Sequence, residues 1–238
     1  MQQKHLQKVP GALAERLFAF IGRLRRAWPR HGRPEDLHQL TRIFPNIKLS
    51  EGYMLDYLSM GGLKSRWIWP YARPQEDEAI PDALAEIARD QLVGLRESTQ
   101  AIPIEVKTLY RYLTYPATAL GVFEYAIFIK ELWATKSETK ANDWLSMHPI
   151  FSRASFENWM RKAGEIAKRI DRPTNFEPVV QMTAGSGAEV RFLMYESQVW
   201  KRITWINLHI DPRGFVRSSV GKVIVDMGQR RGAEYGTH

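Results

Sequence analysis

The chain has 238 residues, of which 34 are Lys or Arg and 26 are Asp or Glu, so its formal net charge is +8. Hydrophobic residues make up 44% and charged residues 25%, a globular composition that excludes collagen-like and disordered chains. The absence of cysteine excludes disulfide bonds, thiolate nucleophiles and thiolate zinc sites, and it fits a reducing compartment.

The sequence predicts a cytoplasmic protein without a membrane span. Its longest weakly charged stretch, residues 117–129, is shorter than the roughly 20 apolar residues that a spanning helix needs. Glu15 and Arg16 interrupt the first apolar run, which argues against a secretory signal. A mitochondrial presequence within the arginine-rich residues 1–34 is the alternative.

The positive charge is concentrated near the start of the sequence. Residues 1–33 contain eight basic residues and one acidic residue, whereas residues 76–100 contain seven acidic and two basic residues. Such asymmetry suggests a basic arm that binds nucleic acid or an acidic protein surface. The acidic segment 76–100 could also be the intramolecular partner of this arm.

The N-terminal part of the chain is predicted to form helices. Apolar residues from Leu13 to Trp28 recur at three- and four-residue spacing with arginines between them, which indicates a basic amphipathic helix of about 17 residues. Pro29 and Gly32 should end it, and a short helix should follow over residues 34–44.

Residues 53–71 change to a period of two, which is typical of strands. Two β-prone runs flank Gly61 and Gly62, and this arrangement predicts a hairpin because glycine adopts the positive φ of tight turns. Pro70 and Pro74 should end the second strand. Trp67, Trp69 and Tyr71 share one face of that strand; they form a candidate stacking platform or part of a core.

Residues 76–172 are predicted to be mainly helical. Apolar spacing predicts helices over residues 84–95, 106–113 and 116–134. A further helix is predicted over residues 155–171, with Ser155 as its N-cap and Pro173 after its end.

The last quarter predicts a four-stranded antiparallel meander. The strands are expected at residues 177–183, 188–195, 198–210 and 215–227. Short turns join them, and the sequence from Asp211 to Gly214 has the residue preferences of a type I turn. We therefore predict an α+β fold: a helical arm (1–33), one domain (34–227) and a flexible tail (228–238).

The arm and the last sheet together favour a nucleic-acid-binding protein, for example an RNA-binding subunit of a larger assembly. Alternation puts Ile203, Trp205, Asn207 and His209 on one face of the third strand, where bases could stack on the ring while cations meet phosphates. The expected contacts are Arg23, Arg25, Arg26, Arg30 and Arg33 in the arm, and Lys201, Trp205, Arg213 and Arg217 on the sheet.

Two other functions remain open. The N-terminal helix could instead dock an acidic partner as a protein-interaction module. The third hypothesis is a metal-dependent nuclease. Pro81-Asp82, followed by Glu105 and Lys107, resembles a nuclease pattern in which two acidic residues bind a divalent metal. The nuclease motif lies on helical patterns, so the sequence favours a binding protein without a cofactor over an enzyme.

Two smaller groups could also carry chemistry. His209 and Asp211 share a strand face and could bind a metal ion, although nothing in the sequence identifies a third ligand. Glu124 lies in an apolar helical run and is the candidate for a buried carboxylate with a raised pKa; the favoured alternative is that a tyrosine or arginine of a neighbouring element pairs with it.

Overall fold

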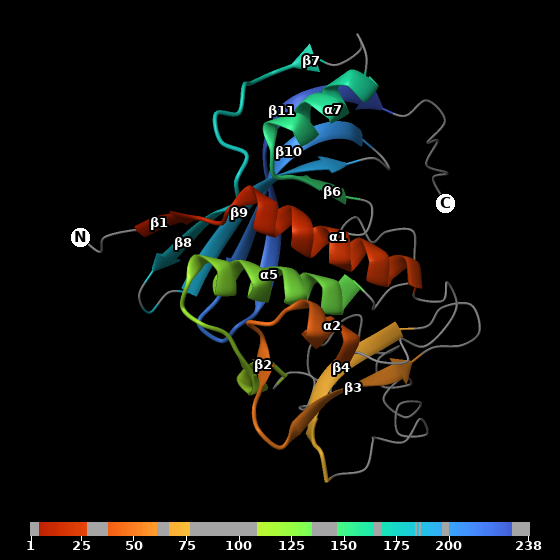
Figure 1. Cartoon of the computed structure of the whole chain (residues 1–238), viewed down its shortest axis with the longest axis vertical. Helices are drawn as coiled ribbons and strands as arrows, with labels where there is room; N and C mark the ends of the chain where they lie inside the picture. The colour runs from red at the N-terminus through yellow and green to blue at the C-terminus, as the bar shows by residue number, and fades with distance from the viewer. Residues whose placement is uncertain are drawn as a thin grey trace, which may run out of the picture. The chain divides into compact units, whose positions relative to one another are not determined.

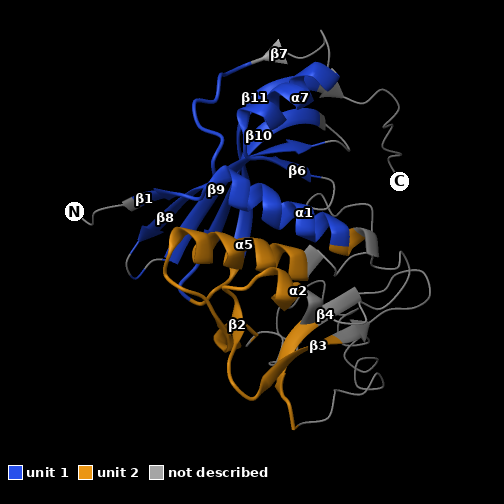
Figure 2. Cartoon of the chain, in the orientation of Figure 1, with its two compact units in different colours: residues 1–23, 143–212, 216–238 blue, residues 24–142, 213–215 orange. Residues whose placement is uncertain are grey.

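The computed structural model describes residues 5–27, 38–60, 67–76, 109–134, 147–163, 168–183, 185, 187–196 and 200–229. The chain divides into two compact units, which Figure 2 shows in different colours. Unit 1 comprises residues 1–23, 143–212 and 216–238, and unit 2 comprises residues 24–142 and 213–215. Each unit is therefore assembled from segments that lie far apart in the sequence.

The fold is mixed α+β, as the sequence predicts (Figure 1). The helices are α1 (Gly11–Ala27), α2 (His38–Ile43), the 3-10 helix η2 (Leu109–Tyr112), α5 (Ala119–Ala134) and α7 (Arg153–Ala163). The strands are β1 (His5–Lys8), β2 (Lys48–Leu49), β3 (Tyr53–Met60), β4 (Trp67–Pro74), β5 (Leu113–Thr114), β6 (Met147–Ile150), β7 (Lys168–Arg169), β8 (Val179–Thr183), β9 (Gly187–Glu196), β10 (Trp200–Ile210) and β11 (Val216–Gln229). In the described part of the chain, no helix is both long and apolar enough to cross a membrane.

Unit 1 is built on one antiparallel sheet. Its strand order is β1-β8-β9-β10-β11-β7, and β6 pairs with β9 beside β8. The consecutive strands β8 to β11 form the predicted meander. Ile210 pairs with Val216, so the chain reverses over residues 211–215, where the sequence predicts a turn. Gly185, with positive φ, lies between β8 and β9, and Gly187, also with positive φ, is the first residue of β9.

Helices pack against both faces of this sheet. Of the predicted apolar stripe of α1, Leu17 and Ile21 are buried, whereas Leu13 and Phe20 are exposed. Ala14 is buried as well, and the ring of Phe18 lies 6.5 Å from that of Phe192 in β9. Phe156 of α7 packs in a separate cluster on the opposite face. That cluster, here called the α7 cluster, contains Ile150, Phe156, Leu193, Tyr195, Ile203, Ile224, Val225 and Met227.

The predicted helix over residues 155–171 is wrong at both ends. It begins two residues earlier, and the hydroxyl of Ser152, rather than that of Ser155, accepts the backbone N–H bond that caps its first turn. The helix ends at Ala163. Residues 168–169 instead form β7, and the backbone N–H of Ile170 donates to Ile224 at the edge of the sheet. Ile170 is 51% exposed, so pairing with β11 prevailed over the helical spacing.

Unit 2 contains the predicted hairpin and the predicted central helix. β3 pairs with β4 from Tyr53–Pro74 to Met60–Trp67. The expectation that Pro70 ends the second strand is wrong, because β4 continues to Pro74. A two-stranded sheet tolerates this proline because the missing N–H can face the unpaired edge. The predicted helix 106–113 is confirmed only in part: in its described residues the chain forms the 3-10 helix η2, and the strand β5 begins at Leu113.

Helix α5 is buried on nearly all sides, including residues 121–129. Two of its carboxylates are buried with it. Glu131 pairs with Arg25, whose Nε donates to Glu131 Oε2 at 2.9 Å. Glu124 accepts a bond of 3.2 Å from the backbone N–H of Asn46. The predicted helix 84–95 lies outside the described residues.

Candidate functional site

The face of the unit 1 sheet that points away from α1 is polar over part of its area. Alternation along β9 puts Phe192 toward α1 and the exposed Arg191 on the other side. Directly paired residues share a face, so the strand register extends this surface across three strands. It comprises Glu189 and Arg191 of β9, Trp205, Asn207 and His209 of β10, and Arg217, Ser219 and Gly221 of β11. We call this surface the open face.

The centre of the open face is a stacked arginine and tryptophan. The guanidinium carbon of Arg191 lies 4.4 Å from the ring centroid of the half-buried Trp205, which is a cation–π contact. Gly221 faces the same spot: a Cβ there would come within 3.1 Å of Trp205 Cβ and 3.3 Å of Asn207 Nδ2. A side chain at this position would therefore be crowded, and the glycine lets β11 approach Trp205 and Asn207 closely.

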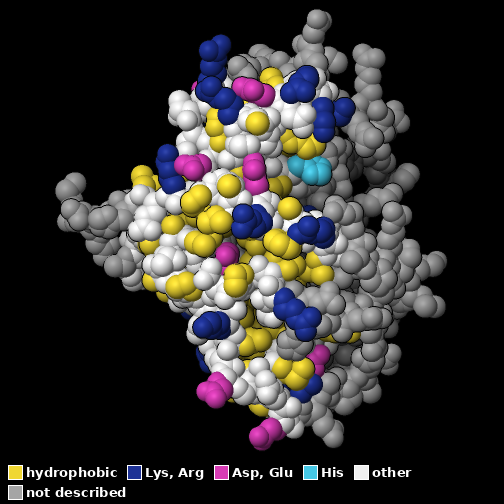
Figure 3. Space-filling view, viewed as in Figure 1, with side chains coloured by type: hydrophobic (Ala, Val, Ile, Leu, Met, Phe, Trp, Pro, Cys, Tyr) yellow, Lys and Arg dark blue, Asp and Glu magenta, His cyan; other side chains and the backbone are white. Residues whose placement is uncertain are grey.

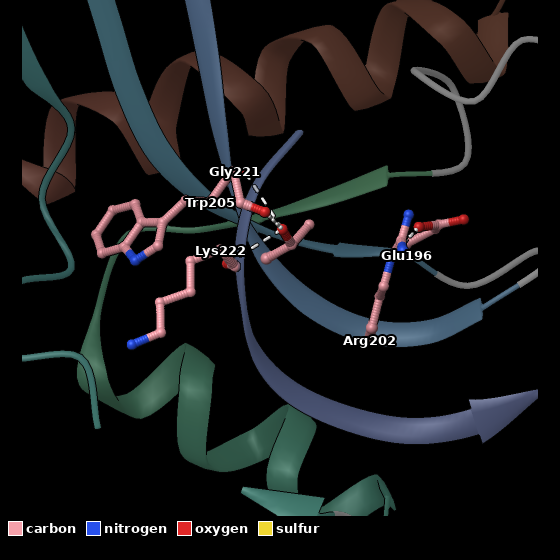
Figure 4. A network of polar contacts seen from close by, with 6 residues as sticks. Glu196, Arg202, Trp205, Gly221 and Lys222 are labelled. Carbon is pink, nitrogen blue, oxygen red and sulfur yellow. Dashed lines mark hydrogen bonds and ion pairs between the residues drawn. The ribbon is translucent and has the colours of Figure 1, made fainter. Parts of the chain in front are cut away.

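An irregularity in the sheet sets the position of Trp205. The β10–β11 register shifts on either side of Thr204, which is typical of a bulge and re-aims the neighbouring side chain. The buried hydroxyl of Thr204 lies 3.2 Å from the carbonyl oxygens of Trp205 and Gly221 and 3.3 Å from that of Lys222, so its proton is shared among them (Figure 4). The hydroxyl thereby offers a hydrogen-bond donor to carbonyl oxygens at the irregularity.

Other charges near this network are paired. Arg202 Nε donates to Glu196 Oε2 at 2.7 Å, in the cross-strand ion pair drawn in Figure 4. Lys222 Nζ donates to Asp171 at 2.7 Å. In the described part of the chain, by contrast, Arg191 and Arg217 have no carboxylate within ion-pair distance. These two guanidinium groups can therefore meet an external anion without first losing an internal partner.

The structure brings only some of the predicted sheet residues together. Trp205 and Arg217 both lie on the open face, and Lys201 is exposed near the start of β10. Arg213 belongs to unit 2, where its guanidinium lies 5.3 Å from the ring centroid of Phe215. Arg191 was not among the predicted contacts, because its position opposite Asn207 follows only from the pairing of β9 with β10.

The predicted arm residues have different surroundings. Arg23 is exposed and lies over the ring of Phe20 at 4.3 Å, on the side of the sheet opposite Trp205. Arg25 pairs with Glu131. Arg26 lies in α1, and Arg30 and Arg33 lie outside the described residues. On the side of the molecule shown in Figure 3, Lys and Arg are separated by hydrophobic and acidic side chains and form no continuous basic patch among the described residues.

The described structure adds no support for the predicted catalytic and metal-binding residues. Asp82, Glu105 and Lys107 lie outside the described residues, so the nuclease reading stays a prediction. His209 Nδ1 lies 3.8 Å from Glu189 Oε2, which is an ion pair only when the histidine is protonated. Within the described ranges, no three His, Cys, Asp or Glu residues, Asp211 included, are grouped closely enough to hold a metal ion.

Glu124 fulfils the expectation made for it. Its side chain is 6% exposed, and burial raises its pKa above the ordinary value, although hydrogen bonds from Asn46 act in the opposite direction.

Comparison of the chain with protein-family models, with curated protein sequences and with solved structures finds no match.

Proposed function

We propose that this protein binds single-stranded nucleic acid on the open face. The observation that carries the proposal is the guanidinium of Arg191, which is stacked on Trp205, is exposed outward and has no carboxylate partner among the described residues. Proteins that bind single strands use such groups, because bases stack on aromatic rings or on arginine planes while cations contact phosphates.

The neighbours of Arg191 supply the remaining contacts. Asn207 and Ser219, which pair with each other across β10 and β11, offer hydrogen bonds to base edges or to sugar hydroxyls. Arg217 and His209 extend the surface along the strands, where a second phosphate could lie. Unpaired bases can reach these groups, whereas the bases of a duplex are stacked inside the helix.

The charge of unit 1 supports the same proposal. Its segments contain 17 basic and 11 acidic residues, so unit 1 has a net charge of +6 out of +8 for the chain. A positive field of this kind raises the association rate with polyanions and is screened by salt.

Binding can be tested with a fluorescein-labelled single-stranded oligonucleotide that has a 5′-hydroxyl end, followed by fluorescence anisotropy at low salt. We expect Arg191→Gln to weaken binding by at least about fivefold, the lower end of the range for loss of a base-stacking contact. Arg217→Gln should weaken it less, through loss of one phosphate contact. The matched control is Arg42→Gln, which removes an exposed arginine of α2 in unit 2.

The same assay separates the open face from the N-terminal helix. If Arg191→Gln and Arg217→Gln bind as the wild type does while Arg23→Gln loses affinity, the open face is not the interface. If no single strand binds at low salt, the proposal is wrong. A duplex of the same length should bind more weakly, since its bases cannot reach Arg191.

A further inference from the structure

A small pocket lies beside the first turn of α7. Arg153, Phe156, Glu157, Arg172, Pro173 and Phe176 line it, and its volume is about 160 Å³. That volume is well below the roughly 300 Å³ at which pockets for drug-sized ligands begin. The pocket can therefore enclose one compact group and leave the rest of a ligand outside.

Two guanidinium groups from separate segments give the pocket its charge. Arg153 is the first residue of α7, and Arg172 precedes Pro173 in the segment between β7 and β8. Both are exposed, and neither side chain has an ion-pair or hydrogen-bond partner among the described residues. Glu157 is the one carboxylate in the lining, so the lining has a net charge of +1.

The inner wall of the pocket is aromatic. The rings of Phe156 and Phe176 lie 5.5 Å apart at 52°, and Phe156 is 3% exposed. Phe176 packs against the α7 cluster, as Trp205 of the open face also does. The pocket and the arginine–tryptophan stack therefore adjoin one hydrophobic cluster of unit 1.

We propose that this pocket binds the phosphate monoester of a nucleotide. A monoester carries a charge between −1.5 and −2 near pH 7 and has three free oxygens, which suits two guanidinium forks. An internal phosphodiester has one charge and fewer free oxygens. The phosphate belongs either to a free nucleotide or to the 5′ end of a strand on the open face, and the second source rests on the proposed function.

The test compares two oligonucleotides of the same sequence, one with a 5′-phosphate and one with a 5′-hydroxyl, and measures the binding of adenosine 5′-monophosphate directly by isothermal titration calorimetry. We expect the 5′-phosphate to tighten binding at least tenfold, and Arg153→Gln or Arg172→Gln to abolish that gain without changing affinity for the 5′-hydroxyl strand. Glu157→Gln should increase the gain, because it removes the opposing charge. Arg161→Gln, an exposed arginine elsewhere on α7, is the control.

The outcomes distinguish this proposal from the proposed function. If both oligonucleotides bind equally and the monophosphate does not bind, the pocket proposal is overturned while binding on the open face stands. If the monophosphate binds and Arg153→Gln or Arg172→Gln removes that binding, but no strand binds, the pocket takes a free nucleotide and the proposed function fails. Binding of the monophosphate that both variants retain also overturns the pocket proposal.

Discussion

Thr204 is the residue that links the sheet irregularity to the open face. Its side chain is 1% exposed, and its hydroxyl is within bonding distance of three carbonyl oxygens, two of them in β11. A methyl group in place of this hydroxyl would remove the donor that these carbonyl oxygens face, and the loss of such hydrogen bonds costs free energy.

We expect Thr204→Val to lower the free energy of unfolding by about 1–3 kcal/mol, because valine has the same shape but no donor. Thr204→Ser keeps the hydroxyl and should be milder. Urea unfolding measures both, and equal stability of the valine variant and the wild type would show that the hydroxyl bonds contribute nothing.

Glu124 gives the protein a pH dependence with a definite sign. Because burial raises the pKa of Glu124 in the folded state, the folded protein holds more protons than the unfolded chain above the ordinary value of 4.5. The contribution of Glu124 to stability is therefore complete below that pH and falls as the pH rises through the folded-state pKa.

We expect Glu124→Gln to remove this decline, since glutamine stays neutral and its amide oxygen can still accept the bond from the Asn46 N–H. The stability difference between variant and wild type should shift in favour of the variant as pH rises above 4.5. Urea unfolding across the acidic to neutral range measures this shift, and parallel pH profiles would contradict it.

The elements could be predicted from sequence where a local signal exists. The meander was predictable because turn residues at Gly185, at Glu196–Ser197 and at Asp211–Gly214 separate four β-prone runs. Helix α1 was predictable from its apolar spacing. Strands β1, β6 and β7 have two to four residues each, too few to show a period, and they exist through pairing with distant strands.

The candidate site likewise combines features that could be predicted from the sequence with features that could not. Alternation along β10 places Trp205 and Asn207 on one face, which the sequence analysis used. The bulge at Thr204 and the contact between Arg191 and Trp205 depend on the register of three strands, and register is a tertiary property that one strand cannot reveal. Arg25 was likewise expected to meet phosphate, yet its partner Glu131 lies 106 residues away.

The start of α7 offers a matched pair of serines. Ser152 accepts the backbone N–H of Ser155 and is the N-cap, whereas the sequence pattern had favoured Ser155 for that role. We expect Ser152→Ala to lower the free energy of unfolding by about 1 kcal/mol. Ser155→Ala should have little effect, because alanine is a good helix former at an internal position. Chemical unfolding compares the two, and equal losses would contradict the assignment.

At the scale of the whole molecule, the structure changes what the charge of +8 indicates. Basic residues are concentrated in positions 1–33 of the sequence. However, the guanidinium of Arg25 pairs with Glu131, and Arg23 lies on the side of the sheet that α1 covers, opposite the open face. Unit 1 as a whole has a net charge of +6, and its unpaired arginines include Arg191 and Arg217 on the open face. These residues are the reason why the proposed binding surface is the sheet and not the N-terminal helix.

The most direct test is the salt dependence of affinity for a single strand, measured for the wild type and for the double variant Arg191→Gln/Arg217→Gln. Each phosphate contact to a single strand contributes a slope of about −0.7 in log K against log salt, so losing the phosphate contact of Arg217 should make the slope shallower by about 0.7, while losing the stacked Arg191 should lower the affinity itself. We predict a steep slope for the wild type and this loss in the variant. An unchanged slope and affinity in the double variant, or no binding at low salt, would contradict the account.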